Sequence, residues 1–187
     1  EENSPFINEG RNILIEEFGS DYITYFSILT CIASGLKTRA EIEAELGIDN
    51  IGSYLVRLEN YYRLITKSLP IFSKPNSKKV RYQLDDCFLV FWFRFFYKYQ
   101  SLVENKALAT LNEIIQRDYS TVSGFMMERY FARKFSEKGK YIVGKWWDRK
   151  GENEIDLIVA DPIKKEAWVY ELKKNGERYN EKVLKAK

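Results

Sequence analysis

Two segments near the C-terminal end of the chain alternate apolar and polar residues, which is the pattern of half-buried β-strands. The apolar positions of these segments, residues 154–161 and 166–173, are Ile155, Leu157, Val159, Trp168, Tyr170 and Leu172. The run between them contains an aspartate, a proline and two lysines, and is typical of a turn. The pattern therefore predicts an antiparallel hairpin.

Charged residues share one face of this predicted hairpin. Its turn is centred between Ile163 and Lys164. Asp156 then lies opposite Glu171, and Lys173 follows on the same face because side chains along a strand alternate with a period of two. Facing carboxylates destabilise a sheet unless a cation neutralises them. Their Cβ atoms would be about 5 Å apart, close enough for both carboxylates to reach one Mg²⁺ or Mn²⁺ ion.

These residues predict a hydrolytic metal site. Asp156 and Glu171 would hold the cation, assisted by the carbonyl oxygen of Leu172. Lys173 would orient an attacking water or stabilise the charge that develops on a phosphate. The alternative is a surface hairpin in which Glu154 pairs with Lys173 and Asp156 is exposed.

An aspartate followed on the next strand by Glu-x-Lys, here Asp156, Glu171 and Lys173, resembles the motif of the PD-(D/E)xK nuclease superfamily. The leading proline–aspartate pair is missing from this sequence, since Ile155 precedes Asp156. The resemblance implies a nuclease-like domain that hydrolyses phosphodiester bonds in DNA with a bound divalent cation.

Another carboxylate lies on the helix that periodicity predicts for residues 118–138. Glu128 falls in the middle of the apolar stripe of this helix. A carboxylate on a buried face must be paired, bound to a metal or protonated. In the nuclease superfamily a helix before the core sheet often carries a glutamate of the metal site, so the resemblance implies that Glu128 supports catalysis. The alternative is a glutamate at the edge of the stripe that pairs with Arg129 or Arg133.

The first half of the chain predicts three helices followed by a basic hairpin. Helices are expected over residues 21–34, 39–46 and 50–62, and β-strands over residues 64–72 and 79–84. Thr38 and Glu41 form a capping box that opens the second helix, and Gly47 ends it. Asn50 is placed to cap the third helix. This order of elements predicts a winged helix-turn-helix domain.

The predicted winged helix carries candidate DNA contacts. Ser53, Tyr54 and Arg57 lie on the third helix, where they would meet a major groove. The basic residues of the hairpin, which would reach phosphates, are Lys74, Lys78, Lys79 and Arg81. Double-stranded DNA is therefore the expected partner. The alternative is a winged helix that docks another protein.

Residues 86–103 predict a helix that is dense in aromatic side chains. We expect this helix to form a hydrophobic bridge between the two domains, because an aromatic stripe at helical spacing is usually core. The alternative is a stacking platform for single-stranded nucleic acid, since basic residues interleave with the aromatic ones.

Composition narrows the possible chemistry. The 187 residues include no histidine, which excludes Ser-His-Asp triads, histidine-ligated zinc and histidine-based nuclease mechanisms. Cys31 and Cys87 lack CxxC spacing and predict reduced thiols of a cytoplasmic protein. The formal net charge of +3 does not by itself indicate nucleic acid. No signal peptide or membrane span is predicted.

Several stretches occur in a distinctive order: SILTCIASGLKTRAEIEAELGI, SKPNSKKVRYQLDDCFLVFWFRF, SGFMMERY, WWDRKGENEIDLIV and VYELKK. This order resembles the C-terminal half of a bacterial and archaeal ATPase family, in which a P-loop ATPase domain precedes a winged helix and a nuclease-like domain. The resemblance implies an upstream ATPase domain as a partner in the same polypeptide. No GxxxxGK[ST] motif occurs, so this chain should not bind ATP through a Walker site.

The sequence therefore predicts an α+β protein with a winged-helix domain over residues 1–85, bridging helices over 86–117 and a PD-(D/E)xK nuclease-like domain over 118–187. The resemblance implies a further helix and strand after the Glu-x-Lys strand, which leaves open a truncated domain. The expected function is a DNA-binding, metal-dependent nuclease-like region of an ATPase. The alternative is a catalytically inactive module that binds DNA or protein and regulates an ATPase.

Overall fold

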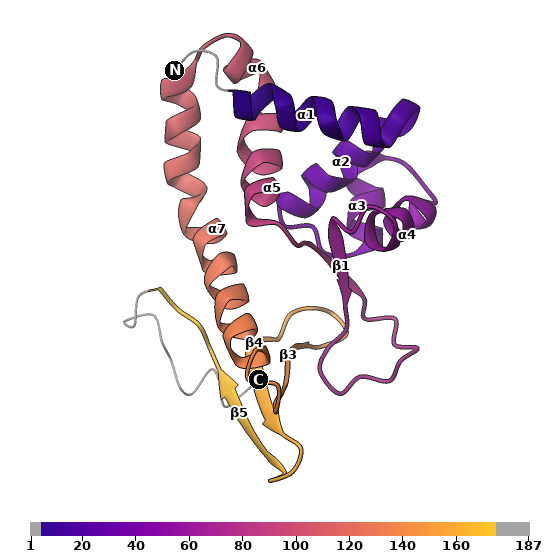
Figure 1. Cartoon of the computed structure of the whole chain (residues 1–187), viewed down its shortest axis with the longest axis vertical. Coiled ribbons are helices and arrows are strands. Elements are labelled where there is room, and N and C mark those ends of the chain that lie inside the picture. The colour runs from indigo at the N-terminus through magenta and orange to yellow at the C-terminus, as the bar shows by residue number, and fades with distance from the viewer. Residues whose placement is uncertain (1–4, 175–187) are drawn as a thin grey trace. The chain divides into compact units, whose positions relative to one another are not determined.

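A computed structural model of the chain describes residues 5–174, and the side chains of residues 11–174. These residues form two compact units. Unit 1 comprises residues 5–68 and 81–117, and unit 2 comprises residues 69–80 and 118–174. The fold is α+β, with a two-stranded sheet in unit 1 and a three-stranded sheet in unit 2 (Figure 1). No helix among the described residues is both long and apolar enough to cross a membrane.

Unit 1 is mainly helical. Its elements in chain order are α1 (Pro5–Phe18), η1 (Gly19–Asp21), α2 (Tyr22–Ala33), α3 (Arg39–Leu46), α4 (Gly52–Asn60), β1 (Ile65–Ser68), β2 (Arg81–Leu84), α5 (Cys87–Phe91), the π-helical η2 (Trp92–Tyr97) and α6 (Gln100–Glu104). The strands β1 and β2 pair antiparallel. Three helices followed by a β-pair is the order that the sequence predicts, and the winged-helix assignment of this order stays a prediction.

The core of unit 1 forms around α2. The side chain of Phe26 is fully buried, and its ring makes edge contacts with the rings of Phe18, Trp92, Phe93 and Tyr97. The aromatic stretch that was expected to bridge two domains therefore packs on α2 within unit 1. It is also divided into α5, η2 and α6, whereas the sequence predicts one helix.

The predicted capping box of α3 is confirmed. The Glu41 amide donates to the Thr38 hydroxyl at 3.3 Å, and the Thr38 amide donates to the Glu41 carboxylate at 2.7 Å. Gly47 ends the helix in the left-handed region, at φ 63°. The predicted cap of α4 is wrong: Ile51 occupies the N-cap position, and Asn50 lies before it with φ 63°.

The two strands of unit 1 are shorter than the sequence predicts. Residues 69–80, expected to continue the strands and form the tip of the hairpin, belong to unit 2. The reason is that hydrogen bonds to unit 2 replace the bonds of the ladder. The Ile71 amide donates to the carbonyl of Lys145 at 2.7 Å, and the Trp147 indole donates to the carbonyl of Lys79 at 3.2 Å. We call residues 69–80 the basic segment.

Unit 2 is built on three antiparallel strands in the order β3 (Ile142–Trp147), β4 (Glu154–Asp161) and β5 (Glu166–Tyr170). The bounds of β4 are those that the sequence predicts. The predicted register is also confirmed, from Leu157 opposite Tyr170 to Asp161 opposite Glu166. The Asp161 carboxylate holds the turn by accepting bonds from the amides of Ile163 and Lys164, at 3.0 Å each.

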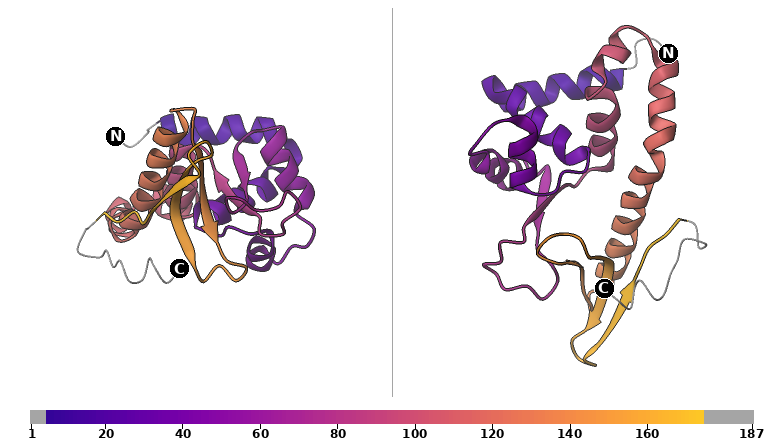
Figure 2. Two further views of the ribbon diagram at one scale, coloured as in Figure 1. Left: turned by 90° about the horizontal axis from the view of Figure 1, so that it is seen from below. Right: turned by 180° about the vertical axis from the view of Figure 1, so that it is seen from behind.

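The helix α7 (Leu108–Ser136) begins ten residues before the predicted start at residue 118, and the boundary between the units falls inside it. Its C-terminal half lies beside the sheet of unit 2 (Figure 2). Tyr170, paired with Leu157, contacts Phe135 of α7 at 5.6 Å between ring centroids.

The other face of the sheet meets the basic segment. Gly144 is paired with Ile158, and a Cβ atom at Gly144 would lie 3.1 Å from Cβ of Ile71. Leu157 and Ile158 are neighbours in β4 and point to opposite faces, so α7 and the basic segment cover opposite faces of the sheet. This explains why β4 is buried from Leu157 to Asp161, whereas the sequence predicts a half-buried strand.

Candidate functional site

The structure brings the four predicted site residues of unit 2 together. Glu128 lies on α7, Asp156 on β4, and Glu171 and Lys173 directly after β5. The negative charges of Glu171, Asp156 and Glu128 all act on the ammonium of Lys173. We call this group the carboxylate site.

Asp156 connects β4 to the segment that follows β5. The ladder between these strands ends at Leu157 and Tyr170, one pair before Asp156 and Glu171. The strand predicted to reach residue 173 therefore ends at Tyr170. In place of a ladder bond, the Leu172 amide donates to Oδ2 of Asp156 at 2.8 Å. This bond holds the Glu-x-Lys segment against the carboxylate of Asp156.

Lys173 is an ion-pair partner of Glu171. Its Nζ lies 2.7 Å from Oε1 of Glu171, whose side chain is 11% exposed. This hydrogen bond raises the pKa of Lys173, burial opposes the rise, and the charges of Glu171, Asp156 and Glu128 add to it. Lys173 therefore remains an ammonium at neutral pH, suited to hold a water or a phosphate oxygen rather than to remove a proton.

Glu128 pairs with Lys145 of β3, a residue that the sequence analysis did not select for the site. Both side chains are 22% exposed. Burial raises the pKa of Glu128, the charge and hydrogen bond of Lys145 lower it, and the charges of Asp156 and Glu154 raise it again, so the net direction is upward. Neither predicted alternative partner fills this place: Arg133 pairs with Glu137 at 2.9 Å, and the Arg129 guanidinium lies over the ring of Phe125.

Lys145 was missed because the sequence predicts no strand for residues 142–147, which form β3. The register between β3 and β4 shifts between Gly144 and Trp146, where Lys145 of β3 faces both Asp156 and Leu157, so the extra residue of this β-bulge lies on β4. A bulge bends a strand and re-aims a side chain. The Lys145 ammonium also lies 5.9 Å from the centroid of the Phe125 ring on α7. The lysine itself is visible in the sequence, but nothing in the local pattern indicates a bulge.

The oxygen atoms of the carboxylate site are of the chemical type that binds divalent cations. Mg²⁺ prefers oxygen ligands and is commonly held by one or two carboxylates with water and substrate phosphates. Asp156, Glu171 and the carbonyl of Leu172 provide such a set on adjoining backbone. Within residues 11–174, no three acidic or cysteine side chains gather in a way that could hold a metal ion.

The candidate DNA contacts of α4 differ in exposure. Ser53 and Arg57 are exposed. Tyr54 is half-buried, with its ring centroid 5.1 Å from that of the buried Tyr25. The Arg57 guanidinium also lies over the Tyr25 ring, at 6.0 Å from its centroid. Packing within unit 1 therefore accounts for the position of the Tyr54 side chain without a bound partner. Ser53 and Arg57 remain accessible to solvent.

The basic candidates are divided between the two units. Lys74 and Lys78 are exposed and Lys79 is half-buried, and all three belong to the basic segment of unit 2. Arg81 lies on β2 of unit 1, where its charge acts on the carboxylate of Glu41. The predicted wing is thus two groups of basic residues on different units.

Residues 92–183 match the model of the family DUF234, described as archaeal and bacterial proteins of unknown function. An uncharacterised protein of Methanocaldococcus jannaschii is 34% identical over 160 residues, which make up 80% of this chain and 35% of that protein. The aligned region thus spans about a third of the length of the relative. No solved structure matches the chain significantly. The chain is similar to archaeal and bacterial proteins, and its resemblance to ATPases and nucleases stays a prediction.

Proposed function

We propose that unit 2 hydrolyses phosphodiester bonds in double-stranded DNA at the carboxylate site, with a bound Mg²⁺ or Mn²⁺ ion. One observation carries this proposal. The sequence alone indicates Glu128, Asp156, Glu171 and Lys173, which come from separate segments of the chain. In the structure, Lys173 pairs with Glu171 at 2.7 Å, the Leu172 amide between them bonds to Asp156 at 2.8 Å, and the charges of Glu171, Asp156 and Glu128 all act on the Lys173 ammonium. A surface hairpin with an exposed Asp156 gives no reason for this convergence.

Each residue has a distinct role in the proposed reaction. Asp156, Glu171 and the carbonyl of Leu172 would hold the cation. A cation bound there would polarise a phosphate oxygen and lower the pKa of a bound water. Lys173, held as an ammonium by Glu171, stabilises negative charge that develops on the phosphate. Glu128 adds a carboxylate at the edge of the site and supports its charge balance.

The basic segment supplies the proposed contact with DNA. Lys74 and Lys78 extend an exposed positive surface from the same unit that carries the carboxylate site. Contacts of this kind bind phosphates without reading sequence and release counterions. Ser53, Arg57 and Arg81 of unit 1 are proposed as further contacts.

We also propose that this activity belongs to a cytoplasmic protein with an ATPase domain in the same polypeptide. The support is the resemblance of the sequence to such a family. The relative in Methanocaldococcus jannaschii is also longer than the region that it shares with this chain.

A second candidate is a regulatory module that binds DNA or protein without hydrolysis. The pair between Lys145 and Glu128 favours it, because a lysine already neutralises one carboxylate of the site. A cation held by two carboxylates would also bind more weakly than a cation held by three.

A cleavage assay separates the two candidates. The chain is incubated with linear and supercoiled double-stranded DNA in the presence of Mg²⁺, Mn²⁺ or a chelator. The proposal expects metal-dependent cleavage that Asp156→Asn and Glu171→Gln each reduce by about 100-fold or more, because each change removes a ligand of the cation.

Glu166→Gln is the matched control for Glu171→Gln. Glu166 is an exposed glutamate at the opposite end of β5. It should leave cleavage within about twofold of the parent. DNA binding without metal-dependent cleavage would establish the regulatory module instead. Full activity of Asp156→Asn would remove the carboxylate site from the reaction.

A further inference from the structure

Lys145 is held in place from several directions. Its backbone carbonyl accepts the bond from Ile71 of the basic segment at 2.7 Å. It lies on β3 opposite the bulge of β4 and next to Gly144, which faces the basic segment, so its side chain points to the other face of the sheet, which α7 covers. Its ammonium then lies near the ring of Phe125 and pairs with Glu128. A lysine on a solvated surface has no such set of contacts.

The environment of the pair explains what Lys145 does in the folded protein. Glu128 is 22% exposed and lies near the negative charges of Asp156 and Glu154. Burial and this repulsion both disfavour its ionised form, whereas the Lys145 ammonium favours it. Without Lys145, the site would gather Glu128, Asp156 and Glu171 around the single ammonium of Lys173.

We infer that Lys145 is the resident counter-cation of the carboxylate site, whose ammonium a divalent cation must displace or repel in order to bind. This inference rests on the cation site of the proposed function. Glu128, Asp156 and Glu171 together with Lys145 and Lys173 carry one net negative charge, and the nearby carboxylate of Glu154 adds to it. A divalent ion added to that set meets two positive charges, so removing one of them strengthens its binding.

Of the two lysines, Lys145 is the one expected to yield. Lys173 pairs with Glu171, a proposed ligand on the same short segment, and is 39% exposed, so water screens its charge. Lys145 is more enclosed and neutralises Glu128, which is not among the two proposed ligands. With a cation held by Asp156 and Glu171, the Lys145 ammonium would be available to a phosphate oxygen of the substrate. Lys145 is therefore a positioning residue that links metal binding to substrate binding.

The test measures the affinity for Mg²⁺ and Mn²⁺ by titration calorimetry, without DNA. Lys145→Gln should bind both ions about tenfold more tightly than the parent, which is the size expected for losing one partly screened repulsion. Lys145→Arg keeps the charge and should stay near the parent affinity. Lys164→Gln, which removes an exposed lysine from the turn of the same hairpin, should have no effect.

Thermal unfolding without metal shows whether each variant is folded. If Lys145→Gln does not fold, Lys145→Met retains the apolar stem that packs near Phe125, and the same increase in affinity is expected. A lysine with a purely structural role would predict the opposite, namely a lower melting temperature with unchanged or weaker ion binding. That result in either variant would overturn the inference.

The outcomes also separate this inference from the proposed function. If Lys145→Gln binds ions more tightly but the protein cleaves no DNA, the role of Lys145 as counter-cation is supported and the proposed hydrolysis is rejected. If the parent cleaves DNA but Lys145→Gln binds ions no more tightly, only the role of Lys145 is rejected. If neither the parent nor the Lys145 variants bind an ion, both ideas fall.

Discussion

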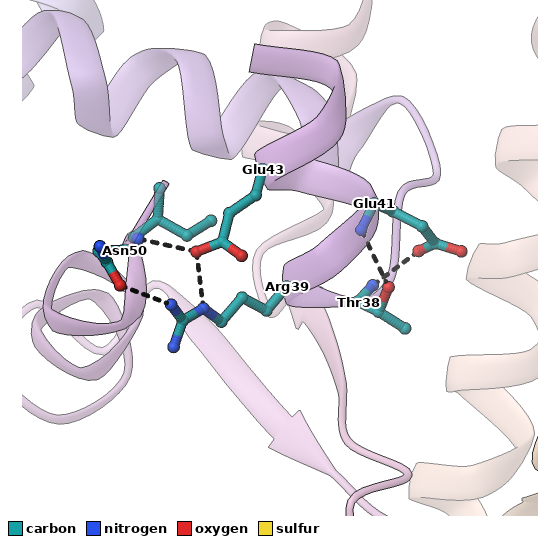
Figure 3. A network of polar contacts seen from close by, with 6 residues as sticks. Thr38, Arg39, Glu41, Glu43 and Asn50 are labelled. Carbon is teal, nitrogen blue, oxygen red and sulfur yellow. Dashed lines mark hydrogen bonds and ion pairs between the residues drawn. The ribbon is translucent and has the colours of Figure 1, made fainter. Parts of the chain in front are cut away.

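Glu43 and Glu128 each have a basic partner, yet their carboxyl pKa values move in opposite directions. Glu43 of α3 accepts a bond from Arg39 at 2.7 Å and another from the Ile51 amide at 3.0 Å (Figure 3). These bonds lower its pKa, the bond from Arg39 being the largest cause. Burial is the largest cause for Glu128, and its pKa is raised although Lys145 pairs with it.

The difference lies in what surrounds each carboxylate. Glu43 is met by donors only, and the network in Figure 3 continues from Arg39 to the side chain of Asn50. Such a saturated network fixes the turn between α3 and α4. Glu128 has one donor and lies near the charges of Asp156 and Glu154. A carboxylate that ionises at a net cost is typical of a site that awaits a ligand.

The largest expected effect concerns two adjacent lysines. Lys173→Ala should reduce metal-dependent DNA cleavage by about 10²- to 10³-fold, because it removes the charge that faces the developing negative charge of the phosphate. Lys174 is the matched control. Its Nζ bonds to the Ser123 hydroxyl at 2.7 Å, away from Glu171, and Lys174→Ala should change the rate less than about threefold. The kcat/KM values of the two variants measure this difference. Equal losses would contradict the role proposed for Lys173.

A smaller effect is expected at the basic segment. Replacing Lys74 and Lys78 together by alanine should weaken DNA binding about tenfold near physiological salt and flatten the dependence of log K on log salt by about 1.8, or 0.9 for each lost phosphate contact. Fluorescence anisotropy over a salt series measures both quantities. The double replacement of Lys164 and Lys165, also exposed in unit 2, is the control. An unchanged slope would indicate a segment that docks protein.

The capping box of α3 should contribute about 1 kcal/mol to the free energy of unfolding. Thr38→Ala removes the acceptor of the Glu41 amide, whereas Thr38→Ser keeps it. Chemical denaturation of both variants measures the difference. A loss for Thr38→Ser as large as that for Thr38→Ala would assign the effect to the methyl group rather than to the cap.

The smallest effects, but the most direct comparison, come from pH. Because the folded-state pKa of Glu128 is raised, the parent should lose stability relative to Glu128→Gln as the pH rises from the ordinary carboxylate range through that raised value. The folded-state pKa of Glu43 is lowered, so the parent's advantage over Glu43→Gln should be present above that range and disappear as the pH falls. Between about pH 3 and 8, the difference in melting temperature between parent and variant should change with pH in opposite directions for the two glutamates. Changes in the same direction would contradict the assigned pKa shifts.

Local patterns were sufficient for part of the fold and of the site. The bounds of β4, the register of its hairpin with β5 and the capping box of Thr38 and Glu41 follow from short-range rules of alternation, turns and caps. Because the register was predictable, so was the approach of Asp156 to the Glu-x-Lys segment. Interactions between neighbours in sequence determine these features.

The features that the sequence did not predict depend on contacts between distant segments. The local pattern of residues 69–80 predicts strand and turn, whereas contacts with β3, such as the approach of Ile71 to Gly144, place them in unit 2. The bulge in β4 and the pairing of Lys145 with Glu128 have no local signal either. The aromatic residues of η2 are expected between two domains, yet they pack on α2. Composition indicates that such residues are buried, but it does not indicate which segment they pack against.

The position of the basic segment has a consequence for biosynthesis. Its hydrogen-bonding partners lie on β3, at Lys145 and Trp147, about seventy residues later in the chain. At a translation rate of about 5–20 residues per second, the segment waits for about 4–14 s before those partners are made. During that interval β1 and β2 can already pair, and the lysines between them stand on a loop without its support. The nascent chain thus passes through a stage in which the residues of unit 1 have been made while the basic segment still awaits the rest of unit 2.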